Sequence, residues 1–366
     1  MYDNRKRLIL LLIFIAFIFS IFTVYIYSAG SLSLSARSAV LYQPDTNSFL
    51  YEKNPDERLS MASTTKIMTA VIALETLSAD EIITPDKRAL GIEGSSIYIK
   101  EGETFFAYDL IYALILSSAN DAAEALAYRI SGSIEAFAEK MNEKAAEIGA
   151  KNTHFNNPHG LDSVGHYTTA RDLALISAYA LKNEVLKEIT STKRKTIESN
   201  LTKRVLVNHN KLLSSYDGCI GMKTGYTKKS GRSLVSAAER DGLTFVAVTI
   251  NAPDDWLDHT KMLNYGYATL ARYVLCKRGD FTREISVIGA KSEKVTVYNK
   301  EGLTLILPKG EKIYSEMILP RYVIAPTNAD TPIGTVIFKC SGEIIAKVFL
   351  YPEISIDKKH NFFNFM

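Results

Sequence analysis

The sequence predicts an α+β protein in which a large mixed domain is followed by a small all-β domain. Helix-type apolar segments gather between residues 64 and 182, with strand-type segments on both sides of them. After about residue 280 the chain contains only short β-branched runs separated by turns. With 366 residues, the chain is also too long for one ordinary core, and it suits a domain of about 250 residues plus a smaller one.

Composition and charge narrow the class of protein. Hydrophobic residues make up 47% and charged residues 23%, which is typical of a globular protein and excludes a mainly disordered chain. The net charge is only +3, and no basic block lies outside the extreme N-terminus, so nothing indicates a nucleic-acid partner. The three cysteines (Cys219, Cys276 and Cys340) fit neither a disulfide framework nor a metal-binding knuckle.

Residues 1–30 are expected to direct the chain to a membrane rather than to join the fold. Three basic residues, Arg5-Lys6-Arg7, precede a charge-free apolar run at 8–27, and small residues follow it at 28–30. This layout is typical of an export signal, but a run of 20 residues is also long enough to span a bilayer. A cleaved signal peptide and an uncleaved signal-anchor therefore both remain open. In either case the positive-inside rule places everything after Ser31 outside the cell membrane, either secreted or attached to it.

The first part of the mixed domain combines a hairpin with several helices. Residues 38–42 and 49–53 are expected to be strands that pair around the turn at 43–47. A loop rich in Asn, Pro, His and Gly occupies 156–169, where Thr169 is expected to cap the helix that follows. The helices expected here are residues 64–77, 109–116, 122–130, 134–148 (ended by Gly149) and 170–182.

Strands dominate the rest of the chain. Residues 234–238 and 245–251 are expected to form a hairpin through Asp241-Gly242, and a closing helix is expected at 258–275. The strands expected after it are residues 285–288, 294–298, 303–307, 335–339 and 344–349.

These elements predict four segments. Residues 1–30 are the signal or anchor, 31–278 the mixed domain, 279–352 a β-sandwich without a catalytic group, and 353–366 a tail. We expect the β-sandwich to serve as a stand or a partner surface.

Three short motifs suggest chemistry. In the first, Ser63 and Lys66 lie three positions apart at the start of an apolar helix, so they share one helix face. A serine needs an adjacent base to become a nucleophile, and lysine can be that base only if burial and a nearby cation lower its pKa. The start of a helix also offers unpaired N–H groups to an oxyanion. Alone this spacing is weak evidence for a catalytic pair, since it recurs in the tail at Ser355 and Lys358.

The second motif, Ser118-Ala119-Asn120, lies between two expected helices. It could present a hydroxyl and an amide to a cleft, but Asn120 could equally be the N-cap of the next helix.

The third motif, Lys223-Thr224-Gly225, precedes the strand-rich region. It suits an extended substrate lying along a strand edge, with the lysine holding a carboxylate or lowering the pKa of a neighbouring lysine. The alternative to a substrate-binding role is that this motif is only the charged beginning of an ordinary strand.

Together, the order and spacing of the three motifs resemble those of the serine D-alanyl-D-alanine carboxypeptidases, the low-molecular-mass penicillin-binding proteins. The resemblance covers residues 35–275, and the β domain looks like the family's C-terminal sandwich. It implies a β-lactamase/transpeptidase-like fold, an antiparallel sheet with a helical cluster, and removal of the terminal D-alanine from peptidoglycan pentapeptide stems. The longer matching stretches are residues 61–70, 118–123, 157–161, 167–174 and 217–225.

The resemblance also implies a role for each matched residue. Ser63 would be acylated by the penultimate D-alanine carbonyl or by a β-lactam such as penicillin, and Lys66 would deprotonate it. Ser118 and Asn120 would relay the proton and bind the substrate amide. Lys223, Thr224 and Gly225 would line the edge strand and meet the terminal carboxylate, and the N–H groups of Ser63 and Tyr226 would form the oxyanion hole. No metal or other cofactor is implied.

This chain departs from the family pattern at the carboxylate site. The family often carries an arginine after the two strands that follow Lys-Thr-Gly, whereas residues 252–258 here contain none. Lys223 is the obvious replacement to pair with the carboxylate, and Arg232 or Lys228 are the reserves. A smaller departure is Ala119, where a glycine is common in the family.

Three alternatives to the carboxypeptidase function are considered for this sequence. A serine β-lactamase shares the motifs but needs a deacylating glutamate, and the loop at 156–169 holds Asp162 and no glutamate. A wall-binding protein that has lost turnover would fit the missing arginine. The histidines, including His159 and His166, could suggest a Ser-His or metal site, but no G-x-S-x-G or H-E-x-x-H motif accompanies them, and a loop-bracing role is expected for His159.

Overall fold

A five-stranded antiparallel sheet forms the centre of the mixed part of the molecule. The computed structural model describes residues 32–359, so the expected signal or anchor at 1–30 lies outside the described residues. Within 32–359, no helix is both long and apolar enough to span a bilayer. The strand order is β2-β1-β9-β8-β7, which leaves β7 as an edge strand. The strands are β1 (Ser38–Gln43), β2 (Ser48–Lys53), β7 (Cys219–Thr227), β8 (Gly231–Arg240) and β9 (Leu243–Ile250).

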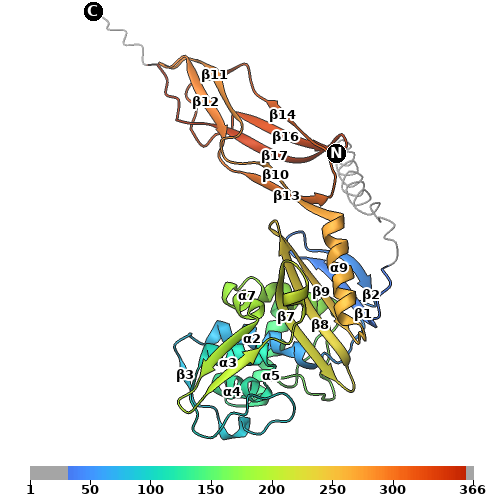
Figure 1. Ribbon diagram of the computed structural model, residues 1–366. Coiled ribbons are helices and arrows are strands. Elements are labelled where there is room, and N and C mark those ends of the chain that lie inside the picture. The colour runs from blue at the N-terminus through green and yellow to red at the C-terminus, as the bar shows by residue number, and fades with distance from the viewer. Residues whose placement is uncertain (1–31, 360–366) are drawn as a thin grey trace, which may run out of the picture. The chain divides into compact units, whose positions relative to one another are not determined.

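Helices cover both faces of this sheet (Figure 1). Side chains alternate along a strand, so Val235 and Val248 face the core around α2, while Ser236 and Thr249 face His259 of α9. The helices are α2 (Lys66–Thr76), α3 (Ala107–Leu116), α4 (Asn120–Ser131), α5 (Ile134–Ile148), α6 (Ala170–Ala180), α7 (Glu184–Ser191), α8 (Leu212–Ser215) and α9 (Asp255–Thr269), with short 3₁₀ turns η1 (Ala62–Thr65) and η2 (Lys87–Ala89).

Most of the expected helices of this part are confirmed. Residues 134–148 form α5, and Gly149 ends it in the left-handed conformation with φ 93°. Thr169 caps α6, its side chain accepting a hydrogen bond from the Asp172 amide. The sequence did not predict α7, the two-stranded sheet of β3 (Ile82–Ile83) with β4 (Phe105–Phe106), or the hairpin of β5 (Arg194–Glu198) with β6 (Lys203–Val207).

The expected closing helix at 258–275 is wrong in its second half. Helix α9 ends at Thr269, and the chain continues as strand β10 (Leu270–Cys276). Residues 270–276 read Leu-Ala-Arg-Tyr-Val-Leu-Cys, a short apolar run that either a helix or a strand can adopt. Pairing with β13 (Leu303–Pro308) decides for the strand, and no local signal announces that distant partner.

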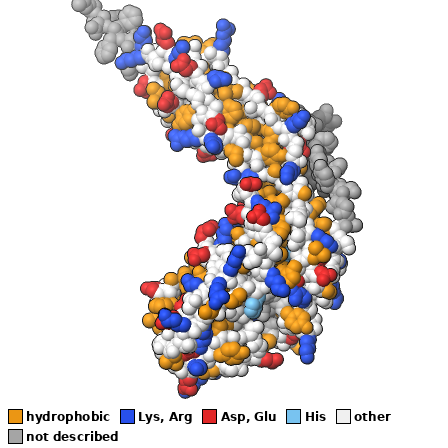
Figure 2. Space-filling view, viewed as in Figure 1, with side chains coloured by type: hydrophobic (Ala, Val, Ile, Leu, Met, Phe, Trp, Pro, Cys, Tyr) orange, Lys and Arg blue, Asp and Glu red, His pale blue; other side chains and the backbone are white. Residues whose placement is uncertain are grey.

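The C-terminal part is all β, as predicted. A six-stranded sheet has the order β14-β16-β17-β12-β11-β15, and β10 pairs with β13 in a second sheet. Its core includes Val297, Val336 and Leu350, all 0% exposed. On the face shown in Figure 2, charges of both signs are interspersed over the surface. The strands of the six-stranded sheet are β11 (Thr282–Ile288), β12 (Lys294–Asn299), β14 (Ile313–Ile318), β15 (Tyr322–Ile324), β16 (Gly334–Cys340) and β17 (Glu343–Pro352), of which β14 and β15 were not expected.

Candidate active site

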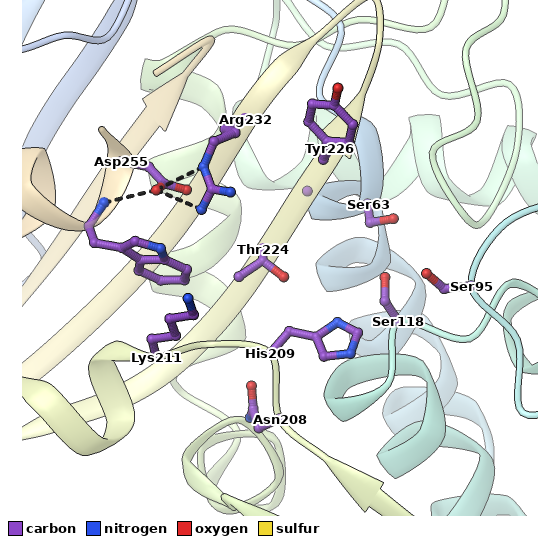
Figure 3. Close-up of a pocket in the computed structure, with 12 residues that line it drawn as sticks. Ser63, Ser95, Ser118, Asn208, His209, Lys211, Thr224, Tyr226, Arg232 and Asp255 are labelled. Carbon is purple, nitrogen blue, oxygen red and sulfur yellow. Dashed lines mark hydrogen bonds and ion pairs between the residues drawn. The ribbon is translucent and has the colours of Figure 1, made fainter. Parts of the chain in front are cut away.

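A cavity of about 550 Å³ lies where the edge strand β7 passes the start of α2 (Figure 3). All three sequence motifs reach it. Lys66, Asn120 and Lys223 are not among its lining residues and are each at most 3% exposed. The lining residues are Ser63, Ser95, Ser118, Asn208, His209, Lys211, Thr224, Gly225, Tyr226, Arg232, Asp255 and Trp256.

Ser63 and Lys66 lie side by side, as their spacing predicts. Ser63 belongs to the 3₁₀ turn η1, and Lys66 is the first residue of α2. The Lys66 Nζ atom lies 3.1 Å from Ser63 Oγ. It also bonds to Asn120 Oδ1 at 2.7 Å and to the His159 carbonyl at 2.6 Å. Three oxygen atoms therefore fix the amine beside the hydroxyl.

Burial gives Lys66 a property that a proton acceptor needs, a lowered pKa. The side chain is 0% exposed, and this desolvation, followed by the charge of Lys223, lowers its pKa well below the ordinary value, while Asp121 acts in the opposite direction. Burial also lowers the pKa of Lys223 to about 7. A lysine at this site can therefore be neutral at a pH where an exposed lysine is charged, which is the condition for it to accept a proton from Ser63.

The second motif forms the turn between α3 and α4. Ser118 lines the cavity and has a positive φ of 58°. Asn120 does not cap α4, because the N-cap position is Ala119 and Asn120 is the first helical residue. Its side chain instead accepts from Lys66 and donates to the Glu93 carbonyl at 2.5 Å. The alternative of a simple capping asparagine is therefore wrong.

The third motif lies on the edge strand β7. Thr224, Gly225 and Tyr226 line the cavity, whereas Lys223 is 1% exposed and its amine donates to the Thr224 carbonyl at 3.0 Å. A Cβ atom on Gly225 would come within 3.0 Å of the Ser63 backbone nitrogen. Glycine thus allows the edge of β7 to pass close to the Ser63 amide.

The histidines act as braces in the described structure. The ring of His159 bonds to Glu124 at 3.2 Å, while its carbonyl holds Lys66. His166 bonds to Thr65 Oγ1 at 2.8 Å, which ties the 156–169 loop to the turn carrying Ser63. Within residues 32–359, no cluster of three or more His, Cys, Asp or Glu side chains is arranged to hold a metal ion.

Sequence reasoning did not assign several cavity residues to the site. Ser95 comes from the loop before β4, and Asn208, His209 and Lys211 follow β6. No local sequence motif marks these residues. Three of them follow the β5–β6 hairpin, which was itself not predicted from the sequence. Asp255 and Trp256 belong to residues 252–258, which contain no arginine, and both contact Arg232 in the folded protein.

Comparison with known protein families identifies both parts of the chain. Residues 26–254 match the family model of peptidase S11, described as D-alanyl-D-alanine carboxypeptidase. Residues 273–358 match the model of the penicillin-binding protein 5 C-terminal domain.

Individual proteins agree with this result. The D-alanyl-D-alanine carboxypeptidase DacF of Bacillus subtilis is 34% identical over 330 residues, covering 87% of this chain and 85% of the relative. DacC of Escherichia coli is 32% identical over 333 residues, covering 86% and 82%. The crystal structure of penicillin-binding protein 5 from Haemophilus influenzae aligns with a TM-score of 0.66 at 28% identity, covering 89% of this chain and 98% of that one. The Streptomyces K15 DD-transpeptidase aligns with a TM-score of 0.61 at 33% identity over 64% of this chain and 98% of its own.

Proposed function

The chain belongs to the peptidase S11 family of D-alanyl-D-alanine carboxypeptidases and is a serine-type D-Ala-D-Ala carboxypeptidase, and from this premise we propose that Ser63 is its nucleophile. The observation that carries the proposal is the placement of a fully buried Lys66 amine 3.1 Å from Ser63 Oγ, at the wall of the cavity. A serine hydroxyl becomes a useful nucleophile when an adjacent group can remove its proton.

Acylation then follows from the positions of these groups. Ser63 Oγ attacks the carbonyl carbon of the penultimate D-alanine as its proton passes to the neutral Lys66 amine. The peptide C–N bond breaks, and the departing nitrogen receives a proton through Ser118, so that free D-alanine leaves and the acyl group stays on Ser63 as an ester. Water then hydrolyses the ester and restores the hydroxyl.

The backbone supplies the remaining stabilisation. The close passage of Gly225 beside the Ser63 nitrogen supports an oxyanion site made by the N–H groups of Ser63 and Tyr226. The hydrogen bonds of Asn120 to Lys66 and to the Glu93 carbonyl support its proposed role in orienting the substrate amide.

We assign Lys223 to the tuning of Lys66. A lysine in this motif could also bind the substrate carboxylate, but this side chain is buried and its amine donates to the Thr224 carbonyl. Below its own pKa of about 7, its positive charge instead favours the neutral form of Lys66.

The experiment that tests this function is intact-protein mass spectrometry after addition of penicillin, followed over time. Wild type should gain the mass of one penicillin and keep it as a slowly hydrolysed ester, whereas Ser63→Ala should gain none. Labelling of Ser63→Ala would refute the nucleophile assignment. Rapid loss of the adduct with steady consumption of penicillin would indicate a β-lactamase, for which the loop at 156–169 offers no glutamate.

Members of this family are penicillin-binding enzymes that act on peptides outside the cytoplasm. We propose that this chain acts on peptidoglycan stems at the outer side of the cell membrane, directed there by Arg5-Lys6-Arg7 and the apolar run at 8–27. A reporter enzyme fused after residue 366 should be active only when exported. Activity of that fusion confined to the cytoplasm would refute this topology.

A further inference from the structure

The cavity contains one guanidinium among its described lining residues, that of Arg232. Residues 252–258 carry no arginine, and Lys223 does not line the cavity. Arg232 does line it, from strand β8. In the register of the sheet, Arg232 pairs with Tyr226 of β7, so it is the diagonal neighbour of Thr224.

Arg232 is held in a defined orientation. Its Nε and Nη2 atoms donate to Asp255 Oδ1 at 3.1 and 2.8 Å, and its guanidinium lies 5.6 Å from the centre of the Trp256 ring (Figure 3 shows the Asp255 contacts). The Asp255 side chain is 3% exposed, whereas that of Arg232 is 41% exposed. The contacts to Asp255 use Nε and Nη2, so Nη1 remains available to a ligand in the cavity.

We propose that Arg232 receives the terminal carboxylate of the substrate, with the Thr224 hydroxyl as a second donor. The proposal rests on the proposed function, because a peptide ending in a free D-alanine brings its terminal carboxylate into the cavity. An unpaired carboxylate is strongly disfavoured away from water, so a cation must meet it there. Arginine offers several N–H donors in one plane and can bond to Asp255 and to a second carboxylate at the same time.

The other charged groups at the cavity define the competing assignment. Lys211 is the other cation among the lining residues, and Asp255 also lines the cavity, where it offsets part of the Arg232 charge. Burial and the charge of Lys223 lower the pKa of His209, which favours its neutral form. The choice therefore lies between Arg232 and Lys211.

The test compares kcat/KM for an N-acylated tripeptide ending in D-Ala-D-Ala with kcat/KM for the same peptide as its C-terminal amide. Wild type should prefer the acid. Arg232→Gln should lower kcat/KM for the acid about 30-fold or more and change the value for the amide by less than about threefold, because only the acid carries the buried charge. Arg232→Lys should recover part of the preference, since it keeps the charge without the planar fork.

The matched control is Arg240→Gln. Arg240 lies on the same strand, also pairs with an aspartate (Asp217) and packs over aromatic rings, but it is not a cavity residue. It should leave the acid-to-amide ratio at the wild-type value. Loss of the ratio in Lys211→Gln but not in Arg232→Gln would overturn the assignment, as would a wild type that cleaves acid and amide equally well.

A binding measurement separates this inference from the proposed function. Trp256 is the only tryptophan of the chain, so fluorescence of the Ser63→Ala protein reports directly on the neighbourhood of Arg232. The acid peptide should change this fluorescence and bind about 30-fold or more weakly when Arg232→Gln is added. Equal binding with and without Arg232 would overturn the inference, even if the wild type remains an active carboxypeptidase. A wild type that cleaves neither peptide would instead refute the proposed function.

Discussion

At the scale of single residues, the proposed chemistry depends on two buried lysines. Lys66 and Lys223 are 0% and 1% exposed, and burial lowers the pKa of both. A buried ammonium loses its hydration, so the neutral amine gains relative to it. In the proposed mechanism, burial allows Lys66 to act as a base and keeps Lys223 out of the cavity lining, so the substrate carboxylate is assigned to Arg232 on the neighbouring strand.

The first prediction concerns the charge of Lys223. In Lys223→Ala, removal of a positive neighbour favours the protonated form of Lys66 and raises its pKa. Below about pH 7, where Lys223 of the wild type is charged, less neutral Lys66 amine is then present in the variant, so the rising limb of the pH profile of penicillin acylation should move to higher pH. The measurement is the acylation rate between pH 5 and 10.

The control is Lys228→Ala, which removes an exposed lysine from the turn after β7 and should leave the profile in place. A lower rate in Lys223→Ala with no displacement of the limb would contradict the tuning role and indicate direct contact with the substrate.

At the scale of an element, the loop at 156–169 supports the nucleophile. Gly160 has φ +90°, and a Cβ atom there would lie 1.9 Å from the Ala62 carbonyl oxygen, one residue before Ser63. His166 and the His159 carbonyl connect the same loop to Thr65 and Lys66. The loop therefore sets the position of the turn that carries the active-site serine.

The second prediction is that Gly160→Ala lowers both stability and penicillin acylation. We expect a loss of more than about 2 kcal/mol in the free energy of unfolding, because strain in the left-handed region adds to a clash with backbone. The matched control is Gly91→Ala, which also has a positive φ (+70°) but no atom within 4 Å of the added Cβ. It should cost only about 1 kcal/mol and leave acylation intact. Equal effects in urea titrations of the two variants would show that the clash is absent.

The third prediction concerns His259, which joins α9 to the sheet. It bonds to Ser236 at 2.5 Å and Thr249 at 2.9 Å, and burial lowers its pKa to about 3. Between the ordinary histidine pKa of about 6.5 and this value, the unfolded chain binds the extra proton. The histidine contribution to stability is therefore complete above pH 6.5 and decreases as the pH falls towards 3.

His259→Gln should reduce the slope of unfolding free energy against pH in this window by up to about 1.4 kcal/mol per pH unit. Chemical denaturation at pH 7.0, 6.0 and 5.0 measures that slope. His166, whose pKa burial lowers to about 4, should keep part of the dependence in the variant. A slope identical to that of wild type would mean that His259 is already protonated in the folded protein.

At the scale of the whole molecule, all cavity residues precede Leu257, and the strands from β10 onward contribute none. The fourth prediction is that a protein ending at Thr269, where α9 gives way to β10, is still acylated by penicillin on Ser63. We place the boundary there because β10 pairs with β13 of the C-terminal part. The D-alanyl-D-alanine carboxypeptidase of Streptomyces sp. (strain K15) is 36% identical to this chain. The match covers 84% of that relative but only 61% of this chain.

Circular dichroism and penicillin labelling of the shortened protein test this prediction, with its Ser63→Ala form as the unlabelled control. A shortened protein that is folded but takes up no penicillin would show that the C-terminal strands are needed for the site.

The sequence by itself determined the class of fold and the family, and it supplied the residues from which the proposed site is built. Helix periodicity and capping residues are local signals, which is why α5, Gly149 and the Thr169 cap could be predicted. The i, i+3 spacing of Ser63 and Lys66 is also local, because one turn of helix is enough to bring the two groups together.

Only the tertiary structure decided what depends on contacts between distant segments. It made residues 270–276 a strand through pairing with β13, and it turned Asn120 from a possible helix cap into a ligand of the Lys66 amine. It also buried Lys223 and brought Arg232 into the cavity beside Asp255. Burial and strand register are properties of the assembled sheet, and no window of sequence around Lys223 or Arg232 contains them.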